Sequence, residues 1–223
     1  MTDNATVIRT EISRPAPEIV KGFLALATTA LSDFLVLDNV MRHAIHPLWG
    51  PPPRIAGPAF TVRTPKHDNL MLHAAIYLAE PGDVIVVEAG DEEMAVAGGN
   101  VCAIAQRRGV AGFVIDGVIR DVGESRDRGF PLFARGRSPI PAGKKGPGHI
   151  NAPIRCGGVA VSPGDLVVAD EEGIVVVPAA RAADLLAKAT AKAAADAATS
   201  LDDWEKKHRA GVDAALKAGG FRK

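Results

Sequence analysis

The sequence predicts an α/β fold with a helical arm at its C-terminal end. Between residues 59 and 116, short apolar runs bounded by Gly and Pro alternate with segments of helical periodicity. Strands in this order lie parallel and are joined by right-handed helical crossovers. After residue 178 the chain becomes rich in Ala, the strongest helix former. We therefore expect an α/β domain over residues 1–178 and a helical arm over residues 179–223 that packs against another subunit.

The composition is that of an ordinary globular protein without an excess of either charge. Hydrophobic residues make up 47% of the 223 residues, and Lys+Arg and Asp+Glu both number 26. Because no basic excess is present, binding to nucleic acid or to a membrane is not indicated. The N-terminus is polar, and no apolar run reaches the roughly 18 residues of a membrane helix. We expect a cytoplasmic protein.

Apolar periodicity and Gly or Pro breaks define the elements expected in the first half of the chain. Pro15 and Pro17 suit the first turn of a helix, where a missing N–H group costs nothing. The run Gly50-Pro51-Pro52-Pro53 is a rigid break that a central strand does not tolerate. The expected helices cover residues 15–37, 69–78 and 100–108, and the expected strands cover residues 59–63, 83–88 and 112–116.

The second half begins with a segment of a different kind. Residues 138–151 are rich in Gly, Pro and Lys, which is typical of a mobile loop over a site or at an interface. Short β-rich pieces separated by turns follow it, and Ser200 suits the N-cap of a second helix in the arm. The expected strands cover residues 159–161, 166–169 and 174–177, and the expected helices cover residues 179–200 and 201–217.

A glycine pair precedes the helix expected at residue 100. Because Gly98 and Gly99 have no side chains, the backbone can approach a ligand closely there. The free N–H groups at a helix start attract a carboxylate or a phosphate. A plain connecting turn explains the pair equally well. The full glycine pattern of dinucleotide-binding folds is absent, which argues against a nucleotide cofactor.

An Arg-Asp pair follows the strand expected at residues 112–116. Arg120 offers a planar fork for a carboxylate, and Asp121 is a hard oxygen ligand suited to Mg²⁺ or Mn²⁺. An exposed ion pair of little consequence is the alternative interpretation. The pair lies 22 positions after Gly98. Parallel strands bring such loops to one edge of a sheet, where open α/β sheets bind ligands, so we expect both motifs in one site.

The remaining polar residues give weaker indications. The six histidines form no zinc-binding pattern and are expected to be structural or exposed, with His149 the one expected to touch a substrate. Lys144 and Lys145 either attract acidic groups or are simply solvated. No nucleophile elbow is present, and the apolar strands contain no lysine for a Schiff base. Cys102 and Cys156 match no zinc spacing, although they could pair with each other.

Three segments together resemble one protein family. They are GGNVCAIAQRRGVAGFVIDGVIRD at residues 98–121, RIAGPAFTV at 54–62 and HINAPIRCGGVAVSPGDLVVADEEGIVVVP at 149–178. The family is that of the 4-hydroxy-4-methyl-2-oxoglutarate / 4-carboxy-4-hydroxy-2-oxoadipate aldolases, which also includes the regulator of ribonuclease activity A and related oxaloacetate decarboxylases. The resemblance covers roughly residues 23–178. It implies an α/β/β/α swivelling-type domain in trimers or hexamers, with sites between neighbouring subunits.

The resemblance also implies roles for both motifs. Asp121 would hold a divalent metal, Mg²⁺ or Mn²⁺, directly. Arg120 would be the catalytic residue and would contact the pyruvyl part of a small 2-oxo acid substrate. The pyruvyl carboxylate would bind to backbone amides of the loop that contains Gly98, Gly99, Asn100 and Val101.

The chain departs from the family pattern at Gly99, where an acidic residue that orders metal-bound water is common. A carboxylate from the neighbouring subunit's arm usually joins the same water shell, and here Glu205 is the first candidate, ahead of Asp202 and Asp203. Either another carboxylate, such as Glu205 or Glu124, replaces the missing acid, or the substrate carries its own acid group. The second alternative is favoured, because Gly99 leaves more room and less negative charge for an anionic substrate.

The resemblance implies a metal-dependent lyase. It would be a class II-type pyruvate aldolase that cleaves 4-hydroxy-2-oxo acids to pyruvate and an oxo acid, with oxaloacetate decarboxylase side activity. The metal and Arg120 would stabilise the enolate that both reactions produce. Two alternatives stay open, a non-catalytic regulator of ribonuclease E and a lyase for another 2-oxo acid. The arm favours the lyase, and Gly99 counts against it.

Overall fold

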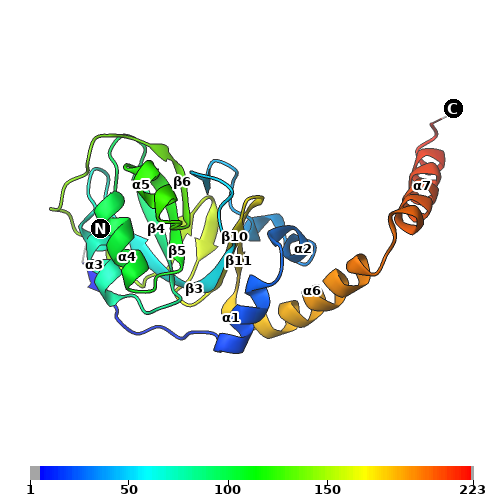
Figure 1. Ribbon diagram of the computed structural model, residues 1–223, viewed down its shortest axis with the longest axis horizontal. Coiled ribbons are helices and arrows are strands. Elements are labelled where there is room, and N and C mark those ends of the chain that lie inside the picture. The colour runs from blue at the N-terminus through cyan, green and yellow to red at the C-terminus, as the bar shows by residue number, and fades with distance from the viewer. Residues whose placement is uncertain (1–5, 222–223) are drawn as a thin grey trace, which may run out of the picture.

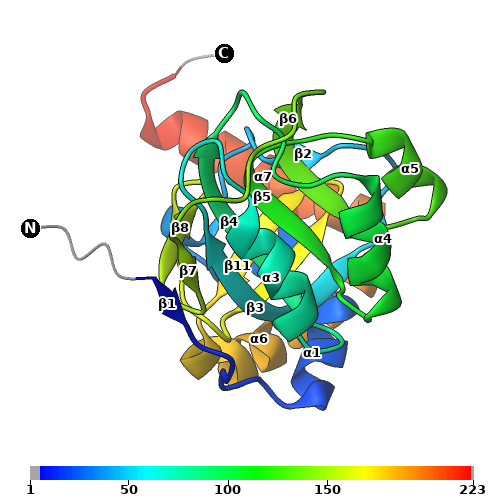
Figure 2. The same cartoon turned by 90° about the vertical axis from the view of Figure 1, so that its left-hand side faces the viewer.

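Four parallel strands form the centre of the fold. The computed structural model describes residues 6–221. In it β3 (Ile55–Arg63), β4 (Val84–Asp91), β5 (Gly112–Ile119) and β6 (Leu132–Arg137) are neighbours in that order. The connecting helices α3 (Leu70–Leu78), α4 (Gly99–Arg107) and α5 (Val122–Asp127) lie on one face of this sheet (Figures 1 and 2). The parallel order and crossovers predicted from the sequence are confirmed.

Side chains alternate between two cores along the central strands. On β4, Ile85 and Val87 pack under the helices, whereas Val84 and Val86 face a second β layer. The alternation follows from the two-residue period of a strand. The second layer holds the antiparallel pair β10 (Leu166–Asp170) and β11 (Gly173–Val177), with β10 also paired to the first half of β3, and the hairpin of β8 (Ile154–Cys156) and β9 (Val159–Val161).

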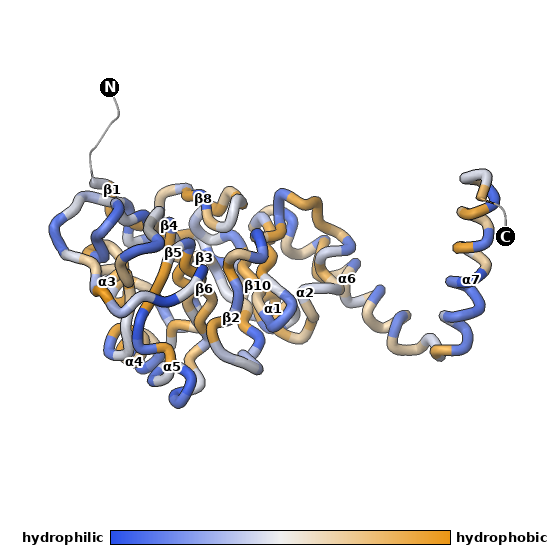
Figure 3. The backbone as a smooth tube through the Cα atoms, turned by 90° about the horizontal axis from the view of Figure 1, so that it is seen from above, coloured by the Kyte–Doolittle hydropathy of each residue, from blue (hydrophilic) through white to orange (hydrophobic). Residues whose placement is uncertain are grey.

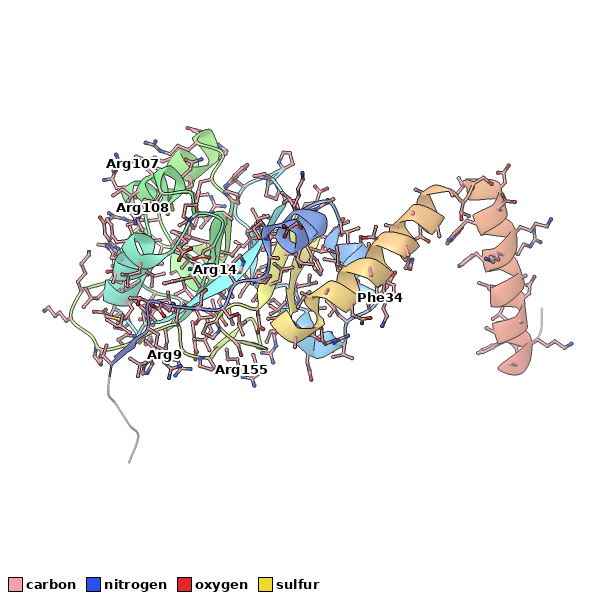
Figure 4. The ribbon with its side chains drawn as sticks, turned by 90° about the horizontal axis from the view of Figure 1, so that it is seen from below. Arg9, Arg14, Phe34, Arg107, Arg108 and Arg155 are labelled. Atoms are coloured by element: carbon pink, nitrogen blue, oxygen red, sulfur yellow. The ribbon has the colours of Figure 1, made fainter. Side chains whose placement is uncertain are left out.

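A third core lies on the outer face of the second β layer. On β10, Val167 faces inward, while Leu166 and Val168 face α1 (Pro17–Leu24), α2 (Thr28–Ser32) and α6 (Ala182–Ala197). Phe34 lies beside α6, and its carbonyl accepts a hydrogen bond from Arg181 at 3.2 Å (Figure 4). The layers therefore run helices, sheet, sheet, helices, and the expected α/β/β/α arrangement is confirmed.

Short elements and cationic side chains close the edges of the domain. Its remaining elements are β1 (Val7–Ile8), β2 (His46–Pro47), β7 (His149–Ile150) and the 3₁₀ turns η1 (Leu37–Asn39) and η2 (Ala179–Arg181). Arg14 fastens the N-terminal segment through a bidentate pair with the buried Asp83, at 2.9 and 2.8 Å. Arg108, at the end of α4, donates to the carbonyls of Ile76 and Tyr77 at the end of α3 (Figure 4).

The single helix predicted over residues 15–37 is wrong. The chain forms α1 and α2 instead, with a break between them at residues 25–27. Thr28 donates from both its N–H and its hydroxyl to the buried carboxylate of Asp170, at 3.0 and 2.6 Å. This contact joins residues 142 positions apart and marks the start of a new helix. The local apolar periodicity therefore could not predict the break. Strand β5 also extends to Ile119, beyond its predicted end at residue 116, and β6 was not predicted.

The C-terminal arm has a packed half and an exposed half. In α6, Ala182, Leu185 and Ala189 are buried in the third core. In α7 (Leu201–Ala218) no residue is buried, and the helix stands away from the domain (Figure 1). Ser200 caps it, accepting a hydrogen bond from Asp203 N at 3.1 Å, as predicted. Within residues 6–221, no helix is both long and apolar enough to span a bilayer.

Candidate functional site

The loops that follow β4 and β5 are fastened to each other at the carboxyl edge of the sheet. Val96 N donates to Val118 O, and Arg120 N donates to Ala97 O, both at 3.0 Å. These bonds place Gly98, at the start of α4, against Arg120 and Asp121 at the start of α5. The two sequence motifs therefore lie together, as their spacing on parallel strands predicts.

Asp121 is held in a specific orientation by the backbone. It adopts the left-handed conformation (φ 59°, ψ 36°), which Asp tolerates better than most residues, and this turns its carboxylate back toward α4. Its Oδ2 accepts a hydrogen bond from Gly99 N at 3.0 Å and lies 3.4 Å from Arg120 Nε. Within the described residues, no hydrogen bond reaches Oδ1. One carboxylate oxygen is thus fixed, and the other is open to a ligand.

The close approach of the Asp121 and Arg120 side chains to the start of α4 requires glycine at position 98. A Cβ at this position would stand 2.7 Å from Asp121 Oδ2 and 3.0 Å from Arg120 Nε. Gly98 is also the N-cap of α4, so the N–H groups of Asn100 and Val101 point out of the helix start. Neither donates to a backbone acceptor in the part of the chain that the structure describes. The start of α4 therefore offers free amides to an anion.

The two motifs line one small cleft of about 100 Å³. All six residues predicted from the two motifs contribute to it, and the opposite wall comes from the start of α3 and from the loop after β6. The lining residues are Gly98, Gly99, Asn100, Val101, Arg120 and Asp121, together with Asn69, His73, Ala95, Ala97, Pro141, Ala142 and Lys144.

The Gly- and Lys-rich loop lies over the site, but its hydrogen bonds hold it in place. The buried carboxylate of Asp68 accepts from the N–H groups of Lys145 and Gly146, and Asn69 N donates to Gly143 O at 2.8 Å. Burial alone would raise the pKa of Asp68, but these bonds and the charge of Lys144 hold it below its ordinary value. Asp68 and Asn69 thereby tie the backbone on both sides of Lys144, which lines the cleft, to the start of α3.

Two residues of the cleft were missed in the sequence. Asn69 is only 4% exposed, and its Oδ1 has no hydrogen-bond partner among the described residues. His73 follows one helical turn later on α3. One feature of the sequence could have identified them. Both residues follow β3, which is parallel to β4 and therefore ends at the same edge of the sheet. His149, the histidine expected to touch a substrate, lies in β7 opposite Arg63 and does not line the cleft.

Burial keeps two titratable groups near the cleft uncharged. Desolvation, helped by the charge of Lys144, lowers the pKa of His73 to about 4 against the opposing effect of Asp68. Burial raises the pKa of the Cys102 thiol to about 11, which keeps the thiol protonated at neutral pH. Cys102 and Cys156 are both buried and free, so they do not pair with each other.

A second cavity of about 360 Å³ lies on the other side of Arg120 and Asp121. Arg137, at the end of β6, lines it together with Ser138. Within the described chain, the Arg137 guanidinium has no hydrogen-bond or ion-pair partner. The Arg120–Asp121 pair therefore separates the small cleft, which is lined by backbone amides, from a larger cavity that is lined by the guanidinium of Arg137.

The donor set around Asp121 suits one class of metal ion. No three His, Cys, Asp or Glu side chains converge within residues 6–221, so the three or four protein ligands typical of zinc are not found there. Mg²⁺ and similar hard cations are held by one or two carboxylates and keep several waters. The open Oδ1 of Asp121, in a cleft that also admits an anionic substrate, fits such an ion.

Glu205, the arm carboxylate expected in the water shell, does not reach the cleft of its own chain. It lies on the exposed face of α7, far from α4 and α5 (Figure 1). Asp202 and Asp203 lie on the same helix. None of these three carboxylates lines the cleft of its own chain.

Comparison with known proteins settles the family. A family model described as RraA-like, Aldolase/RraA, matches residues 28–176. The chain belongs to the RraA-like family. A Halalkalibacterium halodurans protein provisionally named 4-hydroxy-4-methyl-2-oxoglutarate aldolase is 42% identical over 84% of this chain and 89% of its own length. The 4-hydroxy-4-methyl-2-oxoglutarate aldolase of Thermus thermophilus is 32% identical over 68% of this chain and 92% of its own.

Solved structures of RraA-like proteins share the fold. An unusual member of the RNase ES inhibitor RraA family from Streptomyces coelicolor superposes with a TM-score of 0.74 at 30% identity, covering 89% of this chain and 99% of its own. The RNA-processing inhibitor RraA of Thermus thermophilus gives a TM-score of 0.63 at 31% identity, covering 68% and 92%. The relatives thus include proteins named as enzymes and proteins named as inhibitors.

The lowered pKa of His73 predicts a specific pH dependence. Between pH 4 and 6.5 the unfolded chain binds more protons at this residue than the folded chain, so its effect on stability is unfavourable at low pH and disappears above pH 6.5. Denaturant unfolding should show that the His73→Asn variant loses less stability than the wild type between pH 7 and pH 5. An NMR titration of His73 with a midpoint near 6.5 would contradict the assignment.

Proposed function

We propose that this chain is a divalent-metal-dependent lyase that cleaves 4-hydroxy-2-oxo acids to pyruvate and a second oxo acid. The observation that carries the proposal is the convergence of free amides at Asn100 and Val101, the Arg120 guanidinium and an open oxygen of Asp121 in one cleft. An amide pair suits the carboxylate of a 2-oxo acid, and a guanidinium suits its 2-oxo oxygen. The relatives named as aldolases support the same reaction.

Each group has a distinct task in the proposed reaction. The C4 hydroxyl loses its proton, C4 becomes a carbonyl as the bond between C3 and C4 breaks, and the electron pair of that bond moves into the pyruvyl part as an enolate. Return of a proton to C3 of the enolate then gives pyruvate. Arg120 stabilises the charge that develops on the enolate oxygen. A divalent ion on Asp121 would supply further electrostatic stabilisation when bound. Loss of CO₂ from oxaloacetate yields the same enolate, so the site also fits a decarboxylase side activity.

Two further features of the cleft suit the part of the substrate that leaves. The buried Oδ1 of Asn69 is an acceptor without a partner in the described chain, and a substrate hydroxyl can donate to it. The unpaired guanidinium of Arg137 in the adjoining cavity suits a second carboxylate. Both 4-hydroxy-4-methyl-2-oxoglutarate and 4-carboxy-4-hydroxy-2-oxoadipate carry such a group, and either is a reasonable first substrate to assay.

The test of this function is metal-dependent pyruvate release. The purified protein is assayed against both acids and oxaloacetate, with Mg²⁺ or Mn²⁺ and with a chelator. We expect pyruvate only with the metal, and we expect the Asp121→Asn variant to lose activity while its fold survives, because the amide cannot replace a hard anionic ligand. Release of no pyruvate from any substrate, together with inhibition of ribonuclease E, would favour the non-catalytic alternative.

The role of Arg120 predicts that Arg120→Lys is severely damaging. Lysine keeps the charge but not the planar pair of donors. The loss of one such contact costs about 2–4 kcal/mol of transition-state stabilisation, so kcat/KM should fall by roughly 30- to 1,000-fold. Steady-state kinetics with oxaloacetate measure this loss. A variant with nearly unchanged kcat/KM would remove Arg120 from the site.

We also propose that the protein is a homo-oligomer, a trimer or hexamer, with the arm crossing to a neighbouring subunit. Helix α7 exposes an apolar set that includes Leu201, Trp204, Val212 and Leu216. Orange stretches alternate with blue ones along the arm in Figure 3. Most of the stability of a helix in a protein comes from the packing of its amphipathic face, and no residue of α7 is buried within its own chain. A second copy of the chain would cover this face and would bring the arm carboxylates toward Asp121.

The arm proposal predicts that truncation after Ser200 lowers activity while the domain still folds. The deletion removes α7 and Glu205 but none of the three cores. Light scattering and the pyruvate assay measure the two effects together, and Glu205→Gln in the full chain separates the carboxylate from the helix. A stable full-length monomer would contradict the proposal.

A further inference from the structure

A third cavity, of about 530 Å³, lies on the side of the sheet that faces the second β layer. Glu88 on β4, Asp116 on β5 and Arg135 on β6 line it, each two residues beyond a buried side chain that packs against the second layer. The turn between β8 and β9 supplies further lining. The described residues that line this cavity are all different from those that line the cleft of Arg120 and Asp121. The cavity is therefore separate from the candidate site.

Each carboxylate in the described lining of this cavity already has a cationic partner. The ion pairs are Glu88–Arg63, Glu92–Arg135, Asp116–Arg135 and Glu93–Lys66. Glu88 also accepts a hydrogen bond from Arg155 N at 3.0 Å, and Asp116 accepts one from Gly157 N at 2.8 Å. The negative charge of the cavity is thus compensated by residues of the chain itself.

The guanidinium groups of Arg42 and Arg155 differ in this respect, because neither pairs with a carboxylate in the part of the chain that the structure describes. Arg155 Nη1 donates to Gly158 O at 2.6 Å, and the Arg42 guanidinium has no hydrogen-bond partner among the same residues. A Cβ on Gly158 would stand 2.9 Å from Arg42 Nε and 3.2 Å from its Cζ. Two positive charges therefore meet at one glycine with most of their N–H donors unused.

The backbone holds both arginines in this place. Arg42 N donates to Gly157 O at 2.9 Å, and Arg155 is paired with Ala160 in the β8–β9 hairpin. Gly158 has a φ of +85°, a conformation that glycine adopts readily, and its lack of a side chain leaves room for Arg42. Two cations fixed beside each other repel, and an anion bound between them would remove that repulsion.

We propose that Arg42 and Arg155 form a second ligand site, which binds the carboxylate of a small organic acid in this cavity. The planar guanidinium group matches the two oxygens of a carboxylate. The acidic side chains that line the rest of the cavity favour a singly charged group over a doubly charged phosphate, because like charges repel. The cavity volume lies within the range of small-molecule sites, about 300–1,000 Å³.

The test is calorimetric titration of the full-length protein with succinate and, separately, with inorganic phosphate. We expect the wild type to bind succinate, and we expect Arg42→Gln to raise the Kd for succinate about tenfold or more, because a hydrogen bond to a charged group is lost. Arg42→Lys, which keeps the charge but not the planar fork, should give a Kd between these two. The variants should fold, since the Arg42 side chain is exposed and its backbone N–H still reaches Gly157.

Two control variants locate the bound acid. Arg107→Gln is the matched control, because Arg107 is exposed, has no hydrogen-bond or ion-pair partner among residues 6–221, and lies on the opposite side of the domain from Arg155 (Figure 4). Arg120→Gln removes the cation of the candidate site. Both variants should leave the Kd for succinate unchanged. A Kd that depends on Arg120 and not on Arg42 would place the acid in the cleft and overturn the proposal.

Three further results would overturn the second site. They are an absence of succinate binding to the wild type, an equal Kd in the wild type and Arg42→Gln, and tighter binding of phosphate than of succinate. Light scattering covers the remaining alternative. If Arg42→Gln dissociates an oligomer of the wild type, a neighbouring subunit fills the cavity in place of a small acid, and the proposal is wrong. The titration uses neither substrate nor metal, so its outcome is independent of the proposed lyase activity.

Discussion

The hydrogen bond from Gly99 N–H to the carboxylate of Asp121 is the contact on which the candidate site depends. It joins the start of α4 to the start of α5 and sets which oxygen of Asp121 is held and which is open. Two features of the chain make it possible: Gly98 lets the two loops approach, and the left-handed backbone of Asp121 turns its side chain back. Both loops follow neighbouring parallel strands, so the order of the sheet supports the contact.

Much of this arrangement follows from the sequence, because it depends on local pattern. The apolar runs of β4 and β5, the glycine pair before α4 and the Arg-Asp pair after β5 each have a local signature, and parallel pairing brings their loops together. The part that the sequence did not predict depends on contacts between distant residues. The hydrogen bonds from Thr28 to Asp170 begin α2 as a helix separate from α1, and the hydrogen bonds accepted by Asp68 hold the loop that contains Lys144. Contacts between residues so far apart in the sequence leave no periodic pattern from which they could be predicted.

Gly99 shows how a departure from a pattern can mislead. On the sequence alone, the missing acid indicates an emptier and less negative loop. In the folded chain, the carboxylate of Glu124 fills the same space from a different helix. The volume and charge of a site depend on all the side chains that reach it, and residues 25 positions apart can exchange such a role when two helix starts are neighbours. Helix α7 stands away from its own domain, so in the proposed oligomer the same principle would extend to a neighbouring subunit.

The most direct test of the account is the position of a metal and a substrate analogue relative to Asp121. Crystals grown with Mn²⁺ and oxalate, a stable mimic of the pyruvate enolate, would give an anomalous signal for the metal and density for the anion. We predict that Mn²⁺ is bonded to Asp121 Oδ1, that oxalate lies between the metal and Arg120, and that one carboxylate of oxalate accepts from the amides of Asn100 and Val101. A metal bound away from Asp121, or oxalate bound outside this cleft, would contradict it.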